Sequence, residues 1–331
     1  MKQFFPLLTR ICLLAAAAAL LPQLSAGAQT VTPADFAPSA TYLFASRDTC
    51  ELFLDVYDPS PGSETAIDGK AKPAILWLFG GGFVSGERSH PHYLQWFKLL
   101  CDNGYRVITA DYRLGLKGQK MGFGLFSIIP SAKKVVEACA EIGVQDLFSA
   151  VTYILDNADA LGVDKDKIVV AGSSAGAMIS VTAEWEICNG MPNASVLPQG
   201  WNFAGVMSFS GAIMSDRGTP SWKERPCPQL LFHGTADKIV PYNKTQAFKI
   251  GMFGSSSLAK QLRKRGYPCS IIRFEGHSHE IASSMLELWS WEKQWLEGEV
   301  VGGTPWENDE LVTDSGIPIP DRASASYKTL Y

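Results

Sequence analysis

A short β-branched run that leads into Gly-x-Ser-x-Gly constrains the fold of this chain more than any other stretch. The run 168–170 precedes Gly172, Ser174 and Gly176, and small, helix-compatible residues follow. This order is typical of a strand, a sharp turn and a helix, in which the central residue is held at strained backbone angles. Glycines two positions before and two after it let the chain segments pass closely. Only Ser174 has glycine at both offsets, so the pattern favours Ser174 over Ser173 as the residue at the turn.

Apolar runs alternate with helical patterns along most of the chain. Continuous or alternating apolar runs predict strands over 50–57, 74–79, 105–110, 168–173, 203–208, 229–232 and 270–274. Helical spacing predicts helices over 93–101, 131–142, 146–155, 175–187, 281–296 and within 244–265. Strands that alternate with helices favour an α/β fold, with a mainly parallel central sheet covered by helices on both faces.

The first 28 residues have the features of a secretory signal peptide. Lys2 and Arg10 precede an apolar run that ends at Leu21, and a small-x-small cleavage site ends at Ala28. We therefore expect a secreted or periplasmic protein whose α/β domain covers residues 29–300. The tail over 301–331 is rich in Pro, Ser, Gly and acidic residues and is expected to be extended over the surface or disordered.

The net charge and the length of the apolar runs bear on which partners the protein can bind. Without the leader, 27 basic residues stand against 33 acidic ones, a balance of −6. There is thus no excess of basic residues to suggest binding to nucleic acid or to an anionic membrane surface. After the leader, no apolar run approaches the roughly 18 residues of a membrane span. We expect neither nucleic-acid binding nor stable membrane insertion, and the oligomeric state stays open.

Six cysteines follow the leader, and none forms a Cys-x-x-Cys pair, which argues against a zinc or thioredoxin-like site. Disulfide bonds and buried free thiols are both compatible with their spacing. The six positions are Cys50, Cys101, Cys139, Cys188, Cys227 and Cys269.

A serine hydroxyl becomes a good nucleophile when a histidine takes its proton and a carboxylate orients that histidine. In a parallel α/β sheet, such groups lie in loops after the carboxyl ends of strands. Of the five histidines, His90 and His92 lie toward a helix, and the turn after His233 favours a structural role. His277 and His279 follow the last predicted strand. We favour His279 as the base, because it directly precedes the closing helix, and keep His277 as the alternative.

Asp237 is the candidate acid, because it lies in the turn just after the strand 229–232. An Asx-turn is the structural alternative for this residue, and Asp216 is the reserve acid. The chain order Ser174, Asp237, His279 is the order found in α/β hydrolases.

Acyl transfer also needs hydrogen-bond donors for the oxyanion of its transition state. The amide of Ala175, the residue after the nucleophile, is one candidate. The run 80–82 at the end of an earlier strand can supply others, because backbone without side chains can approach a substrate closely.

Taken together, these motifs resemble the esterase/lipase group of α/β hydrolases, whose oxyanion loop reads His-Gly-Gly-Gly-Phe. The resemblance covers roughly residues 50–298 and is carried by Phe79-Gly80-Gly81-Gly82-Phe83, Asp111-Tyr112-Arg113, Gly172-Ser173-Ser174-Ala175-Gly176, His233-Gly234-Thr235-Ala236-Asp237 and the loop to His279. It implies a serine esterase of the carboxylesterase type, which works through an acyl-enzyme and needs no metal or organic cofactor. It also implies that Gly81, Gly82 and Ala175 supply the oxyanion amides. Phe79 departs from the pattern, because the group usually has a loop-ordering histidine there.

The substrate is indicated only in outline. Glycine-hinged apolar residues within 115–142 predict an insertion over the active site, and Phe83, Met121, Phe123 and His277 are tentative substrate contacts. An apolar wall is compatible with short acyl or feruloyl groups, on a small molecule or linked to carbohydrate, while lipid esters stay open. Two alternatives are a prolyl-oligopeptidase-type peptidase, for which the mature chain leaves no room for the usual extra domain, and a catalytically silent binding protein on the same fold.

Overall fold

A nine-stranded sheet runs through the protein. The computed structural model describes residues 35–117 and 130–319, with the side chains of the second segment described from residue 135. The strands, in spatial order, are β1 (Ala40–Arg47), β2 (Cys50–Tyr57), β6 (Arg106–Ala110), β5 (Ala74–Leu78), β7 (Ile168–Ser173), β8 (Gly205–Phe209), β10 (Gln229–Gly234), β13 (Ser270–Phe274) and β14 (Asp309–Val312). The pairs from β6 to β14 are parallel, and only β1–β2 and β2–β6 are antiparallel. The predicted α/β fold with a mainly parallel sheet is confirmed.

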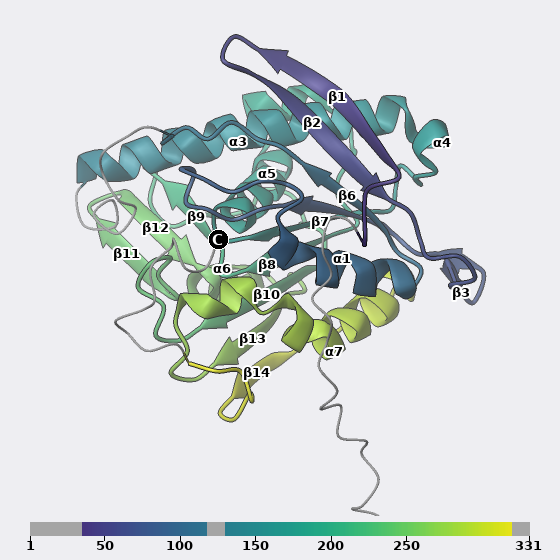
Figure 1. Cartoon of the computed structure of the whole chain (residues 1–331). Coiled ribbons are helices and arrows are strands. Elements are labelled where there is room, and N and C mark those ends of the chain that lie inside the picture. The colour runs from purple at the N-terminus through teal and green to yellow at the C-terminus, as the bar shows by residue number, and fades with distance from the viewer. Residues whose placement is uncertain (1–34, 118–129, 320–331) are drawn as a thin grey trace, which may run out of the picture. The chain divides into compact units, whose positions relative to one another are not determined.

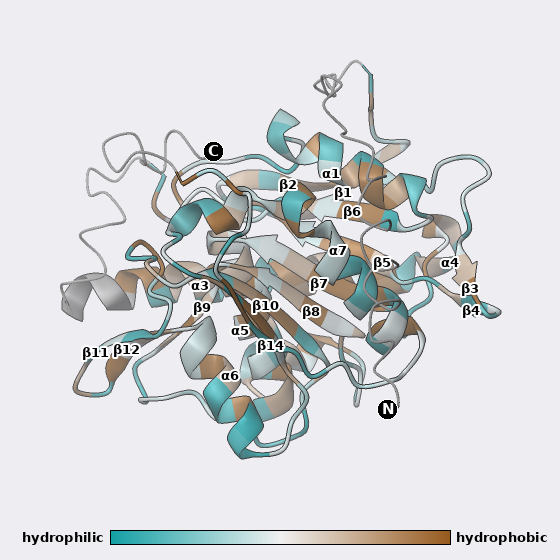
Figure 2. Cartoon of the chain, turned by 90° about the horizontal axis from the view of Figure 1, so that it is seen from below, coloured by the Kyte–Doolittle hydropathy of each residue, from teal (hydrophilic) through white to brown (hydrophobic). Residues whose placement is uncertain are grey.

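Helices cover both faces of this sheet (Figure 1). They are α1 (Pro91–Asp102), α3 (Pro130–Asp156), α4 (Ala158–Leu161), α5 (Ala175–Asn189), α6 (Ser255–Lys264) and α7 (Met285–Trp295), with shorter turns η1 (Pro192–Val196), η2 (His279–Ser283) and η3 (Leu296–Val301). The crossover through α1 moves from β5 to β6, whereas the crossover through α5 moves in the opposite direction, from β7 to β8. Because both crossovers are right-handed, α1 and α5 lie on opposite faces. Figure 2 shows the apolar strands enclosed between these layers.

The strands over 40–47 and 212–215 were not predicted, and three further stretches differ from the predicted elements. The first is α3, one helix where two were predicted with a break near Gly143. A Cβ on Gly143 would lie 2.5 Å from Cδ1 of Ile179, so this glycine permits close packing against α5 instead of ending the helix. By length and composition α3 could cross a membrane, but 61% of that apolar window is buried inside the protein.

The second is the stretch 244–265, within which a helix or two were predicted, and its second half does form the helix α6. Its first half forms the hairpin β11 (Lys244–Ala247) and β12 (Ile250–Gly254), and β12 pairs with β9 (Ala212–Ser215). The hairpin was not predicted, because it depends on pairing with a strand more than thirty residues earlier and not on local propensity. A further short hairpin joins β3 (Ala66–Ile67) to β4 (Lys70–Ala71).

The third is the tail after residue 300, in which β14 pairs in parallel with β13. The sheet thus extends beyond the predicted domain boundary. The predicted signal peptide over 1–28, residues 118–129 of the predicted insertion, which include Met121 and Phe123, and the last twelve residues lie outside the described residues.

The six cysteines after the leader are all free thiols in the structure, so the alternative of disulfide bonds among them is not realised. Cys50 is exposed and the other five are buried. Burial raises the pKa of Cys139 to about 11 and those of Cys101 and Cys269 to about 12, which keeps these thiols protonated.

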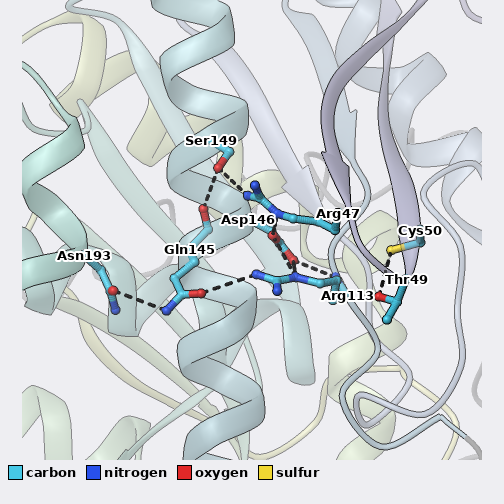
Figure 3. Close-up of polar contacts among 8 residues, drawn as sticks. All are labelled: Arg47, Thr49, Cys50, Arg113, Gln145, Asp146, Ser149 and Asn193. Atoms are coloured by element: carbon cyan, nitrogen blue, oxygen red, sulfur yellow. Dashed lines mark hydrogen bonds and ion pairs between the residues drawn. The ribbon is translucent and has the colours of Figure 1, made fainter.

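A buried carboxylate ties the β1–β2 hairpin to the helical layer. Figure 3 shows Asp146 of α3 between Arg47 at the end of β1 and Arg113 after β6. The Nε atoms of Arg47 and Arg113 lie 3.0 Å and 2.8 Å from the carboxylate oxygens of Asp146, and the Arg113 amide donates to it at 2.9 Å. Because the Asp146 side chain is fully buried, these donors take the place of the water that the carboxylate loses.

Candidate active site

The turn between β7 and α5 has the strained geometry that its glycine pattern predicts. Ser174 has φ 50° and ψ −111°, a left-handed conformation that is unusual for a residue with a side chain. A Cβ on Gly172 would lie 2.4 Å from the carbonyl carbon of Gly176, and a Cβ on Gly176 would lie 2.1 Å from the carbonyl oxygen of Leu78. Any side chain at either position would clash with the neighbouring backbone, so both positions require glycine. Together the two glycines place Ser174 at the start of the helix.

The Ser174 hydroxyl lies against the imidazole of His279. Its Oγ is 2.8 Å from Nε2, and the two residues are only 3% and 2% exposed. His279 is the first residue of η2, which follows the loop after β13. A hydroxyl and an imidazole nitrogen at this distance are in place for proton transfer.

Asp237 completes the arrangement from the loop after β10. Its Oδ2 is 2.7 Å from Nδ1 of His279, while its Oδ1 accepts the amides of Ile239 at 2.9 Å and Val240 at 3.1 Å. One oxygen thus makes the Asx-turn and the other holds the imidazole, so both interpretations of Asp237 apply. Burial raises the pKa of this carboxyl, but the nearby imidazoles of His279 and His233 outweigh burial and hold the pKa well below its ordinary value.

The structure places the reserve candidates elsewhere. Asp216 is exposed after β9, and its amide donates to Glu137. His277 is buried, with Nδ1 3.0 Å from Glu280 and Nε2 2.9 Å from Ser315 of the tail. Both ring nitrogens of His277, the alternative base and a tentative substrate contact, thus bind protein groups that fasten the tail to this loop.

Two amides of the glycine run after β5 have no acceptor among the described residues. The amide of Gly80 donates to Tyr93 Oη at 3.1 Å, whereas those of Gly81 and Gly82 have no hydrogen-bond acceptor in the described part of the chain. Gly81 and Gly82 have φ of 123° and 63°, and a Cβ on Gly81 would lie 2.0 Å from the Ser85 carbonyl oxygen. Free backbone amides in a turn can bind an anion.

Two aromatic residues order this loop where the related pattern has histidine. The ring of Phe79 stacks on Tyr112 at 4.4 Å between centroids, and Tyr112 Oη donates to the Phe79 carbonyl oxygen at 2.8 Å. Phe83 is fully buried and packs edge-on against Tyr112. The expectation that Phe83 contacts substrate is thus corrected. Sequence reasoning missed the role of Tyr112, although its Asp-Tyr-Arg motif was the available signal.

Ala175 is the first residue of α5, so its amide lies at a helix N-terminus, where backbone donors favour an anion. No three His, Cys, Asp or Glu side chains among the described residues are grouped so that they could hold a metal ion. What the site does offer is a hydroxyl, a base, an oriented acid and unpaired amides.

These features define an α/β hydrolase. A serine lies on a strand–turn–helix, and an aspartate and a histidine that follow it in the chain come from loops after later strands. The Phospholipase/Carboxylesterase family model matches residues 117–290, more than half of the chain, and the Carboxylesterase family model matches residues 25–184. The chain therefore belongs to the phospholipase/carboxylesterase family.

The chain also resembles individual relatives and solved structures at low sequence identity. A para-nitrobenzyl esterase of Bacillus subtilis is 31% identical over 141 residues, and a probable N-octanoylanthranilate hydrolase of Rhodococcus erythropolis is 30% identical over 105. These matches cover 42% and 32% of this chain but only 25% and 20% of the relatives. The butyrate-bound structure of an esterase from Thermogutta terrifontis has a TM-score of 0.56 at 20% identity, covering 82% of this chain and 99% of that one. This likeness shows the shared fold.

Proposed function

We propose that this protein hydrolyses carboxylic esters through an acyl-enzyme on Ser174. The observation that carries the proposal is the continuous hydrogen-bonded chain from Ser174 Oγ to His279 Nε2 and from His279 Nδ1 to Asp237. Membership of the phospholipase/carboxylesterase family supports the same reaction class.

Each group has a distinct chemical role. His279 accepts the Ser174 proton as Oγ attacks the ester carbonyl, and then gives that proton to the departing alcohol. Asp237 keeps the hydrogen on Nδ1 of His279, so that Nε2 is free to act as the base. The amides of Gly81, Gly82 and Ala175 stabilise the oxyanion, and each such donor is typically worth about 10²–10³-fold in rate. Water, activated by the same histidine, releases the acid and restores Ser174.

The test compares two adjacent serines. We expect Ser174→Ala to lower kcat on p-nitrophenyl acetate by at least about 10³-fold. The matched variant Ser173→Ala should stay within about tenfold, because its hydroxyl donates instead to the Ala282 carbonyl oxygen at 2.7 Å. A fluorophosphonate probe followed by peptide mass spectrometry should label Ser174 alone. Unchanged turnover in a folded Ser174→Ala protein would overturn the proposal.

The substrate class follows from a panel. We propose esters of short acyl or aromatic acids, on a small molecule or linked to carbohydrate. The panel should contain p-nitrophenyl esters of increasing chain length, a feruloyl ester, an acetylated sugar and a peptide amide. Preference for the amide would support a peptidase, and inertness of wild-type protein toward every member and the probe would support a silent binding protein.

We further propose that the protein is exported and cleaved after Ala28, on the strength of the charged, apolar and small-residue regions of 1–28. N-terminal sequencing of the protein from the medium or periplasm should begin at Gln29. Recovery of the uncleaved chain from the cytoplasm would contradict export.

A further inference from the structure

A second imidazole lies against the acid of the site. His233, on β10, is fully buried, and its Nε2 is 3.4 Å from Oδ2 of Asp237, the same oxygen that holds His279. This Nε2 also lies 3.0 Å from the carbonyl oxygen of Val240. On the other side of the ring, Nδ1 is 2.7 Å from Oγ of Ser255, the first residue of α6.

These partners determine where the hydrogen of His233 lies. A carbonyl oxygen only accepts hydrogen bonds, so the Nε2 that contacts Val240 carries the hydrogen. In a neutral ring Nδ1 is then an acceptor, and it receives the Ser255 hydroxyl. The Nε2–H group is shared between the Val240 carbonyl and the Asp237 carboxylate. His233 therefore presents a fixed donor to the carboxylate in the buried interior.

We propose that His233 is a positioning residue for the Asp237–His279 pair: through its Nε2–H it orients the carboxylate and disperses part of its negative charge. The proposal rests on the proposed ester hydrolysis at Ser174. His233 acts through Asp237 and contacts no reacting atom. It is distinct from the base, since both of its ring nitrogens contact groups other than Ser174.

The groups that face the Asp237 carboxylate determine how loss of His233 should change the pH–rate profile. They are His279 from the loop after β13, His233 from β10, and the amides of Ile239 and Val240. Tyr242 meets the His233 ring edge-on at 5.7 Å, and Lys238 is exposed to solvent. Removing the His233 donor concentrates negative charge on Oδ2. The protonated form of His279 then becomes more favourable, so the acid limb of the pH–rate profile shifts to higher pH.

The variants His233→Gln and His233→Asn form a matched pair. The Gln amide can reach the Nε2 position and keep the donor, whereas the shorter Asn amide reaches only the Nδ1 position. We expect His233→Asn to lower kcat/KM about tenfold or more and to raise the pKa of the acid limb by several tenths of a unit up to about one unit. His233→Gln should recover most of both changes. The two variants are to be compared at equal folded fraction, determined by urea unfolding.

A packing role alone would lower stability and activity in both variants without moving the acid limb, and that result would overturn the proposal. Failure of the proposed function has a different signature, because Ser174→Ala would then leave turnover unchanged. A readout without substrate is the low-field ¹H NMR signal of the His279 Nδ1 hydrogen. It should shift in His233→Asn and return toward the wild-type position in His233→Gln, and equal spectra in all three proteins would also refute the role.

Discussion

Gly176 touches Leu78 backbone to backbone: a Cβ on this glycine would lie 2.1 Å from the Leu78 carbonyl oxygen and 2.5 Å from that of Phe79. The helix that carries Ser174 therefore approaches β5 as closely as the main chain allows. Neither carbonyl can move without disturbing the sheet and the glycine run that follows it.

Gly176→Ala should consequently destabilise the protein. Overpacking a well-packed site costs about 1–3 kcal/mol, and a contact with backbone lies at the upper end of that range. Urea unfolding measures the effect. Gly298→Ala is the control, because Gly298 has nothing within 4 Å of its Cβ position, and its free energy of unfolding should not decrease. Equal stability of the two variants would show that the contact between Gly176 and Leu78 relaxes freely.

Tyr112→Phe tests the ordering of the oxyanion loop. The substitution keeps the ring that stacks on Phe79 and removes the hydroxyl that donates to the Phe79 carbonyl oxygen. Loss of one such hydrogen bond corresponds to about tenfold in kcat. KM should change little, because the loop amides act in the transition state. Tyr153→Phe, at a half-buried tyrosine of α3 that contacts Tyr42, serves as the control, and a kcat loss common to both variants would remove the specific role.

Asp146→Ala tests the buried carboxylate between Arg47 and Arg113. The substitution leaves two guanidinium groups without their shared partner, and removing one member of a buried charge cluster costs about 3 kcal/mol or more. Asp102→Ala breaks the exposed Lys98–Asp102 pair and should cost no more than about 1 kcal/mol. Chemical denaturation of both variants measures the difference, and similar losses would contradict the importance of burial.

Glu186 makes stability depend on pH. Burial, helped by Glu141, raises the pKa of this carboxyl from 4.5 to about 7. Between those values the folded state binds more protons than the unfolded state, so the free energy of unfolding falls as pH rises. A shift of this size corresponds to at most about 3 kcal/mol above pH 7.

Glu186→Gln should therefore be more stable than wild type at pH 8, and the difference should shrink as the pH is lowered toward 4.5. Urea unfolding across this range provides the measurement, with the exposed Glu51→Gln as control. Parallel stability curves for wild type and Glu186→Gln would show that the pKa of Glu186 is close to that of the unfolded chain.

The local part of this site was predictable from residue types. Glycine at 172 and 176 is needed wherever a strand turns sharply into a helix, and buried parallel strands require continuous apolar runs, so the α/β fold and the position of Ser174 followed from the sequence. Asp237 and His279 followed less directly, since loops after strands meet at one edge of a parallel sheet. Of the two histidines of the 277–279 loop, the sequence favoured His279 and left His277 as the alternative.

What the tertiary structure decided depends on contacts between distant residues. The bonds from His277 to Glu280 and Ser315 remove it from the site, and the pairing of β12 with β9 forms a hairpin that was not predicted. The place of His233 beside Asp237 is likewise visible only in three dimensions. Sequence by itself determined which residues can turn, be buried or carry chemistry, because those properties are local. Only the folded chain decided which polar groups meet, because buried donors and acceptors find partners far away in the sequence.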